Sequence, residues 1–254
     1  LSEFDYTENN LIKKSTAFAL LFACLGVPFG KKTHVPYRVP QWLMKATMWQ
    51  KRLFLASFFG AELSKPQVNT YNPKNFYSLQ LNMNKLETLK ENAINFLNDL
   101  RLMLAEFGIA TNNVVDVKGN NYNGKFGKTV GLRFLIKGNE DNLIKFFSNV
   151  NYEYHIKKRK EANLAIAYLK CKEELRQKKQ ENYPVANRDG TVNLRVSKNF
   201  ISFEEFVKSY ALGEEGFVVD EIEDINLIDY AGEVYDFTVN HKDHNFIANS
   251  MVTH

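Results

Sequence analysis

The C-terminal stretch from Val234 to His254 contains three histidines and two aspartates, of which Asp236, His244 and His254 are at positions suited to acid–base chemistry. Apolar and polar residues alternate over 234–239, which predicts a half-buried strand, and a second, broken strand is predicted over 246–253. The polar turn between them would bring Asp236, His244 and His254 within reach of one another. Because histidine titrates near neutral pH, this pattern predicts a proton-transfer site directed at the end of the chain.

A second candidate for chemistry is Glu62, near the end of a helix predicted over Lys51–Pro66. Ala56 and Gly60 lie four residues apart, and small residues at this spacing let two helix backbones approach closely. The sequence therefore predicts a closely packed helix whose terminal carboxylate contributes to a shared metal site.

The C-terminal stretch resembles the splicing motifs of inteins. It contains Val-Tyr-Asp-x-Thr-Val, His-Asn-Phe-x-Ala-Asn and Val-x-His in the order typical of that family, with Ser250 in place of the usual glycine and without the asparagine that closes the motif. The resemblance implies autocatalytic protein splicing. His254 would then hydrogen-bond the scissile carbonyl, His244 would act as acid–base partner near the cyclising asparagine, and Asp236 would support the upstream proton transfers.

The Lys51–Pro66 helix resembles the LAGLIDADG motif of homing endonucleases, with Leu55–Leu63 in register. Glu62 falls on the metal-binding acid, where the family usually has aspartate. The resemblance implies a Mg²⁺-dependent nuclease, a hydrolase of double-stranded DNA, with Glu62 as catalytic residue and metal ligand. Lys158 matches a family lysine near the scissile phosphate, and it equally fits a solvated helix that touches phosphates non-specifically.

The residues after Glu62 predict one αββαββα unit. Its elements are strands at 68–71 and 76–83, a helix from Asn84 to Phe107, strands at 113–118 and 129–137, and a helix at 141–150. The first helix is expected to open with a capping box from Asn84 to Glu87 and to carry an apolar stripe of Leu86, Leu89, Ala93, Phe96, Leu97, Leu100, Leu104 and Phe107. In the LAGLIDADG family such strands form a saddle in the DNA major groove. The DNA contacts predicted on this basis are Gln80, Asn82, Lys118, Asn121, Lys125, Lys128, Arg133 and Lys137. The alternative is that these are ordinary solvent-facing strand residues.

Four further elements are predicted from local patterns. Ala17–Gly26 is expected to be a buried helix with a Ser15 or Thr16 cap, and residues 41–44 a short helical turn. A capping box from Ser202 to Glu205 predicts a helix to about residue 212. Residues 216–228 alternate enough to predict a strand.

Charge is distributed unevenly along the chain. Residues 201–254 contain two basic and twelve acidic residues, a net charge of −10, whereas residues 1–200 contain 31 basic and 17 acidic residues, a net charge of +14. This division predicts two domains with different partners, and the basic part is the candidate for binding nucleic acid.

Together these patterns predict an α+β chain: a LAGLIDADG αββαββα half-saddle followed by a mostly β C-terminal piece of an intein (Hint) splicing domain. The predicted domains are residues 1–150, the endonuclease half; 151–183, a basic helical connector; and 184–254, the splicing piece. The 44% apolar content is enough for sizeable cores.

The favoured interpretation is the C-terminal portion of an intein with an embedded homing endonuclease. Its partners would be double-stranded DNA at the insertion site, flanking extein segments and a missing N-terminal half, since the chain is expected to be a piece of a longer protein. The alternatives are a DNA-binding module with a decayed nuclease and a free-standing endonuclease half that dimerises. Two isolated cysteines and the lack of a membrane-length apolar run predict a reduced, cytoplasmic protein without a membrane partner.

Overall fold

The structure is a computed structural model that describes residues 5–7, 10–12, 14–117, 122–124, 127–182, 200–209, 224–227, 229–233, 239, 246–248 and 251–253. Its contacts divide the chain into two compact units, residues 1–218 and 219–254. This division concerns compactness and not domain identity, so the predicted boundaries at residues 150 and 183 stay a prediction. None of the helices among these residues is both long and apolar enough to cross a bilayer.

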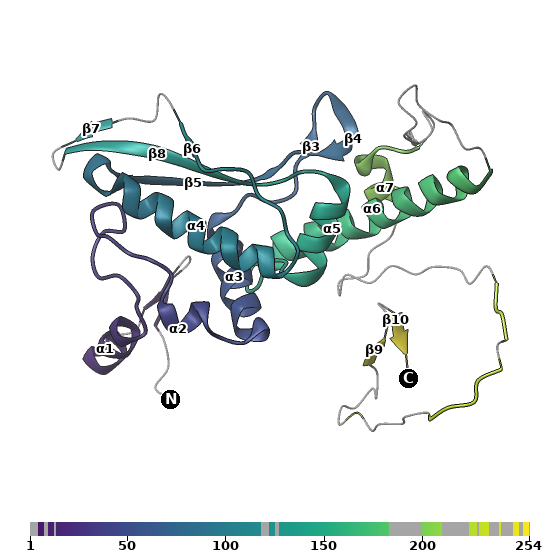
Figure 1. Ribbon diagram of the computed structural model, residues 1–254, viewed down its shortest axis with the longest axis horizontal. Coiled ribbons are helices and arrows are strands. Elements are labelled where there is room, and N and C mark those ends of the chain that lie inside the picture. The colour runs from purple at the N-terminus through teal and green to yellow at the C-terminus, as the bar shows by residue number, and fades with distance from the viewer. Residues whose placement is uncertain are drawn as a thin grey trace. The chain divides into compact units, whose positions relative to one another are not determined.

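Runs of strands and runs of helices follow one another along the first unit (Figure 1). Its helices are α1 (Thr16–Cys24), α2 (Gln41–Met44), α3 (Met48–Glu62), α4 (Lys90–Glu106), α5 (Glu140–Asn149), α6 (Ile156–Asn182) and α7 (Phe203–Ser209), with a 3₁₀ turn, η1, at Glu87–Leu89. Its strands are β1 (Asp5–Thr7), β2 (Asn10–Ile12), β3 (Val68–Asn69), β4 (Asn72–Phe76), β5 (Leu79–Leu86), β6 (Val115–Asp116), β7 (Tyr122–Gly124) and β8 (Gly127–Ile136).

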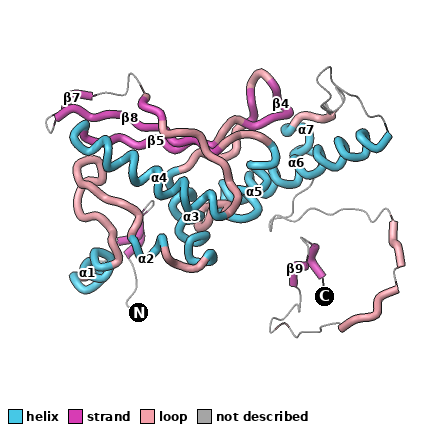
Figure 2. Tube along the Cα trace, in the orientation of Figure 1, coloured by secondary structure: helices cyan, strands magenta, loops and turns pink. Residues whose placement is uncertain are grey.

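The largest sheet is antiparallel and has the order β5-β8-β6, with β7 also paired to β8. In the β5–β8 register Leu79 lies opposite Ile136 and Leu81 opposite Phe134. Because neighbouring residues of a strand point to opposite faces, these buried residues define an inner face. Figure 2 shows the helices of this unit gathered on one side of the sheet, and α4 contacts both β5 and β8 on that side.

Helix α4 covers the inner face with the apolar stripe that the sequence predicts. Ala93, Phe96, Leu97, Leu100 and Leu104 are all buried. The helix ends at Glu106 with Phe107 as its C-cap, and the following Gly108 has a φ of 70°, a conformation that glycine adopts without strain. The predicted start at Asn84 is wrong, because β5 continues through Leu86 and α4 begins only at Lys90.

Helix α3 begins earlier than predicted, at Met48, because Thr47 caps it. The Thr47 hydroxyl accepts from the Gln50 amide at 3.4 Å, and the Gln50 side chain accepts from the Thr47 amide at 3.0 Å, which completes a capping box. Leu55 and Phe59 of α3 are fully buried, and Phe59 packs against Phe146 of α5 with ring centroids 5.8 Å apart. Helix α3 is therefore central to the core of this unit.

Helix α6, in the predicted connector, packs into the first unit. Tyr168 is fully buried among aromatic residues, with ring centroids 5.2 Å from both Phe200 and Phe206 and 5.4 Å from Phe203. Phe203 begins α7, whose predicted capping box is confirmed: the Ser202 amide donates to Glu205 at 2.7 Å. Phe203 and Phe206 of α7 therefore pack that short helix against Tyr168 of α6.

Helix α1 is placed where the sequence predicts it but is not buried. Its Ser15 cap and the following Gly26, with a φ of 98°, are as predicted. None of its residues is buried in the described part of the chain, and Leu20 and Leu21 are more than half exposed. Apolar composition alone therefore gave the wrong environment for this helix, because the described elements leave its sides uncovered.

In the second unit, β9 (Phe246–Ala248) and β10 (Met251–Thr253) pair antiparallel, with Ala248 opposite Met251. The two runs thus form a hairpin, where the sequence predicted one broken strand. Residues 224–227 are not a strand, contrary to the prediction for 216–228. The predicted strand at 234–239 lies outside the described residues, except for Val239, which is irregular.

Candidate nucleic-acid interface

The outer face of the main sheet is lined by amide side chains. Gln80, Asn82 and Asn84 alternate along β5 with residues of the inner face, so all three point outward. Asn82 lies opposite Arg133 of β8, whose Nε donates to Asn82 Oδ1 at 3.1 Å. Amide groups both donate and accept hydrogen bonds, so this face offers a row of adaptable polar groups beside one guanidinium group.

The outer face carries no negative charge from its two long strands. Neither β5 nor β8 contains aspartate or glutamate. Asp116 of the neighbouring β6 lies opposite Leu132, an inner-face residue, and forms an ion pair with Lys90 of α4 at 2.6 Å. An anionic polymer lying across β5 and β8 would therefore meet no carboxylate from these strands.

The structure brings part of the predicted contact set together. Gln80, Asn82 and Arg133 share the outer face. Lys137 is exposed just after the end of β8, and strand alternation assigns it to the same face as Arg133. Alternation assigns Lys128 to the opposite face, and it forms an ion pair with Glu87 of η1 at 2.7 Å. The predicted contacts Lys118, Asn121 and Lys125 lie outside the described residues.

Sequence reasoning missed Asn84 as a member of this face. The pattern Asn84-x-x-Glu87 predicted a capping box at a helix start, although the alternation of Gln80 and Asn82 continues into Asn84. In the structure Asn84 is exposed on β5, opposite Gly131. The signal that would have identified it was the period of two in the polar residues.

Glu62 and Lys158 lie near each other at the C-terminal end of α3. Lys158 Nζ donates to the carbonyls of Gly60 at 2.8 Å and Leu63 at 2.7 Å, so it caps the helix. Burial lowers the pKa of Lys158, and the charge of Glu62 partly opposes this shift. Glu62 is exposed and lies 3.7 Å from Lys32 Nζ. The catalytic roles predicted for Glu62 and Lys158 stay predictions.

The small face of α3 receives a loop and not a second helix. The Glu153 amide donates to the Ala56 carbonyl at 3.0 Å, and a Cβ added to Gly60 would lie 2.5 Å from the Glu153 carbonyl oxygen. Asn151 and Tyr154 have positive φ angles, which bend the loop onto the helix. The small residues allow a close backbone approach as predicted, but the helix–helix contact is wrong for this part of the chain.

The predicted Mg²⁺ site is represented among the described residues by one carboxylate, Glu62. Those residues contain no group of three or more histidine, cysteine, aspartate or glutamate side chains placed to hold a metal ion. Mg²⁺ is commonly held by one or two carboxylates together with water and substrate phosphates, so the Mg²⁺ assignment stays a prediction. The acid–base set Asp236, His244 and His254 lies outside the described residues.

The chain is similar over nearly its whole length to parts of larger proteins. It is 35% identical over 271 residues to the tRNA-splicing ligase RtcB of Pyrococcus furiosus, covering 94% of this chain and 26% of that protein. It is 36% identical over 282 residues to the tRNA-splicing ligase RtcB of Methanocaldococcus jannaschii, covering 97% and 28%. It is 31% identical over 242 residues to the DNA-directed RNA polymerase subunit Rpo1N of the latter organism, covering 94% and 16%. No protein-family model matches the chain.

The chain spans about a quarter of the length of the two RtcB proteins and less of the polymerase subunit. The same stretch therefore aligns within two differently named proteins of one organism. The similarity thus concerns a segment of these relatives and not their whole length.

The names of these relatives correct several predictions from the sequence. They describe a tRNA-splicing ligase and an RNA polymerase subunit, and neither describes an intein, a homing endonuclease or a LAGLIDADG protein. On this finding the predicted intein identity and the predicted functions of protein splicing and DNA cleavage are contradicted. The predicted partners, insertion-site DNA and extein segments, are contradicted with them.

Proposed function

We propose that this chain is the RNA-binding segment of a larger RNA-processing enzyme and that the outer face of its main sheet contacts the RNA. The observation that carries the proposal is the row of Gln80, Asn82 and Asn84 beside Arg133, on strands without a carboxylate. Amides and guanidinium groups hydrogen-bond to phosphates, 2′-hydroxyls and base edges.

The charge of the first 200 residues supports this proposal. Their net charge is +14, and phosphate neutralisation by lysine and arginine supplies most of the non-specific affinity for nucleic acids. Lys137 is exposed at the end of β8, and among the described residues its side chain has no ion-pair partner. Lys137 is therefore placed to extend the contact from the sheet face to a phosphate.

The choice of RNA rests on the names of the RtcB relatives, which describe tRNA splicing and ligation. An enzyme of that kind must hold RNA close to its reactive groups. The proposal assigns this holding role to the present segment and the joining chemistry to the larger protein. Glu62 and Lys158 have no part in the proposed contact.

The test is a binding measurement with an RNA stem-loop and a DNA hairpin of the same sequence. Arg133→Ala is expected to weaken RNA binding about tenfold, because a well-placed guanidinium contact contributes roughly 1–3 kcal/mol. Arg101→Ala is the matched control, since Arg101 is an exposed arginine on α4, which packs on the inner side. It should change affinity less than about twofold, within the range expected for a surface change.

Two outcomes would contradict the proposal. Equal effects of Arg133→Ala and Arg101→Ala would remove the outer face from the interface. Tighter binding of the DNA hairpin than of the RNA stem-loop would keep the interface but overturn the choice of RNA. Measurement over a series of salt concentrations separates phosphate contacts from the other contacts. For phosphate contacts, the logarithm of the binding constant falls linearly with the logarithm of the salt concentration.

A further inference from the structure

The hairpin formed by β3 and β4 ends in a nearly fully exposed aromatic side chain. Tyr71 lies in the two-residue connection between these strands and is 94% exposed. A single exposed aromatic residue is common on protein surfaces, so exposure alone assigns no role to Tyr71. What distinguishes Tyr71 is how firmly the chain beneath it is held.

Side-chain hydrogen bonds fix the backbone on both sides of Tyr71. Asn69 Oδ1 accepts from the amide of Tyr71 at 2.9 Å and from the amide of Asn72 at 3.3 Å. The hydroxyl of Tyr77 accepts from the Thr70 amide at 3.2 Å and lies 2.7 Å from the Thr70 hydroxyl. The backbone of the tip is thus ordered before any ligand arrives, while the ring of Tyr71 stays in solvent.

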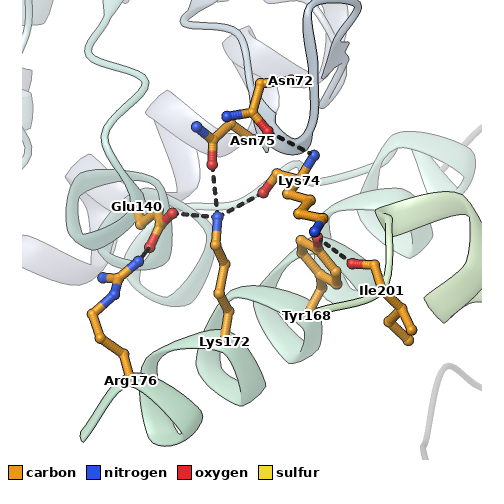
Figure 3. A network of polar contacts seen from close by, with 8 residues as sticks. All are labelled: Asn72, Lys74, Asn75, Glu140, Tyr168, Lys172, Arg176 and Ile201. Carbon is orange, nitrogen blue, oxygen red and sulfur yellow. Dashed lines mark hydrogen bonds and ion pairs between the residues drawn. The ribbon is translucent and has the colours of Figure 1, made fainter. Parts of the chain in front are cut away.

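The base of the hairpin is braced by α6. Figure 3 shows Lys172 reaching from α6 to the Lys74 carbonyl at 2.7 Å and to Asn75 Oδ1 at 2.6 Å. Its ammonium group is 2.5 Å from Glu140, which also binds Arg176. These contacts anchor β4 to α6 and α5, so the hairpin cannot swing freely.

Apolar contacts complete this brace. Phe76, the last residue of β4, packs against Phe203 with ring centroids 4.8 Å apart and against Tyr168 at 6.1 Å. Ordering a loop costs conformational entropy when a ligand binds, and a braced hairpin has already met that cost on folding. An aromatic ring on such a hairpin is therefore well suited to binding a flat group.

The hairpin leads directly into the proposed RNA-binding face. Only Tyr77 and Ser78 separate β4 from β5. The backbone N–H of Gln80 donates to the Ser64 hydroxyl at 2.9 Å, where the chain leaves α3. Figure 1 shows the hairpin rising on the side of the sheet away from α4, which is the side of the outer face. A nucleic acid on that face would extend past the ring of Tyr71.

We propose that Tyr71 is a stacking platform for an unpaired base of the RNA that lies on the outer face. This inference rests on the proposed function and narrows its substrate to RNA with a bulge, loop or single-stranded end. Sequence-specific RNA recognition generally targets such unstacked bases, and aromatic side chains stack on their faces. A fully paired duplex would offer Tyr71 no free base.

The experiment compares a paired RNA stem with the same stem carrying one unpaired 2-aminopurine nucleotide. Wild-type chain is expected to prefer the bulged RNA and to change the fluorescence of the 2-aminopurine on binding. Tyr71→Ala should weaken binding of the bulged RNA by about fivefold to a hundredfold, the range measured for loss of one base–aromatic stack. It should leave the paired stem nearly unaffected, and Tyr71→Phe should keep the preference because it keeps the ring.

Tyr154→Ala is the matched control, since Tyr154 is an 85% exposed tyrosine on a different loop. Equal effects of Tyr71→Ala and Tyr154→Ala on binding of the bulged RNA would overturn the stacking role. An equal loss of affinity for the bulged and the paired RNA in Tyr71→Ala would also overturn it. Failure of the wild-type chain to bind either RNA would instead contradict the proposed function itself. Circular dichroism of each variant separates these results from misfolding.

Discussion

Lys85 and Lys172 are both buried, but their ammonium groups are stabilised differently. Lys172 Nζ lies 2.5 Å from Glu140 Oε1, and the same carboxyl group binds Arg176. Burial opposes ionisation of Glu140, but the hydrogen bonds and charges of Lys172 and Arg176 outweigh it and hold the pKa of this carboxyl below its usual value. Here the lysine is one partner in a compensated charge network.

Lys85 has no such compensation. Its Nζ donates to the carbonyls of Lys32 and Val35, each at 2.5 Å, and lies 3.8 Å from the ring centroid of Tyr37. Among the described residues it has no carboxylate partner, and burial lowers its pKa from 10.5 to about 8. Carbonyl groups and a ring can therefore hold a buried ammonium group, but they stabilise its charged form less than a carboxylate does.

The largest expected effect is that of Lys172→Met. Methionine would remove three contacts of the ammonium group and leave Glu140 half-buried with Arg176 alone, so we expect a loss of about 3 kcal/mol in the free energy of unfolding. Urea denaturation of the 254-residue chain measures this value. The loss should shrink as the pH falls through the depressed pKa of Glu140, because protonation removes the charge that Lys172 compensates.

Lys170→Met is the control for Lys172→Met. Lys170 is exposed on the same helix, so its replacement should change the free energy of unfolding by less than about 0.5 kcal/mol. Similar effects of the two variants would mean that the network in Figure 3 contributes little, and the comparison with Lys85 would then fail.

Lys85→Met should have a smaller effect that depends on pH. Between pH 8 and 10.5 the unfolded chain still holds the proton that folded Lys85 has released, so wild-type stability rises with pH over this range. The variant lacks this gain. We therefore expect it to lie within about 1 kcal/mol of wild type at pH 7 and to fall further behind, by on the order of 1 kcal/mol, toward pH 10.

The measurement is the difference in the free energy of unfolding between Lys85→Met and wild type at several pH values. Taking the difference cancels the contributions of the lysines and tyrosines that titrate equally in both proteins. A difference that stays constant from pH 7 to pH 10 would show that Lys85 keeps its ordinary pKa in the folded chain and would remove the contrast with Lys172.

The sequence was informative where one local rule decides the structure. The capping box at Ser202 and the α4 stripe are confirmed, and Gln80, Asn82 and Arg133 share one face because strand alternation leaves no other choice. The capping box, the stripe and the alternation within each strand depend on residues a few positions apart, whereas the pairing of β5 with β8 brings Arg133 beside Asn82. The same rules determine most of the candidate interface.

The sequence was misleading where distant partners decide the structure. The apolar composition of α1 predicts burial, but burial depends on what packs against a helix. Lys85 is a charged residue on the inner face of a strand, and the carbonyls of Lys32 and Val35 together with the Tyr37 ring make that position tolerable. The loop over Gly60 depends on positive φ angles at Asn151 and Tyr154, and the identity of these residues does not by itself predict those angles.

The smallest effect is expected for Lys32→Ala, which tests whether the segment from Lys32 to Val35 is held through its backbone. The side chains of Lys32 and Glu62 are 69% and 44% exposed and 3.7 Å apart, so their ion pair should contribute less than about 0.5 kcal/mol. Lys85 binds the carbonyl of Lys32, which alanine retains. Lys32→Ala should therefore leave both the free energy of unfolding at pH 7 and its rise above pH 8 unchanged. Loss of that rise would instead mean that the Lys32 side chain shields Lys85 from water, because solvent reaching Lys85 would restore its pKa.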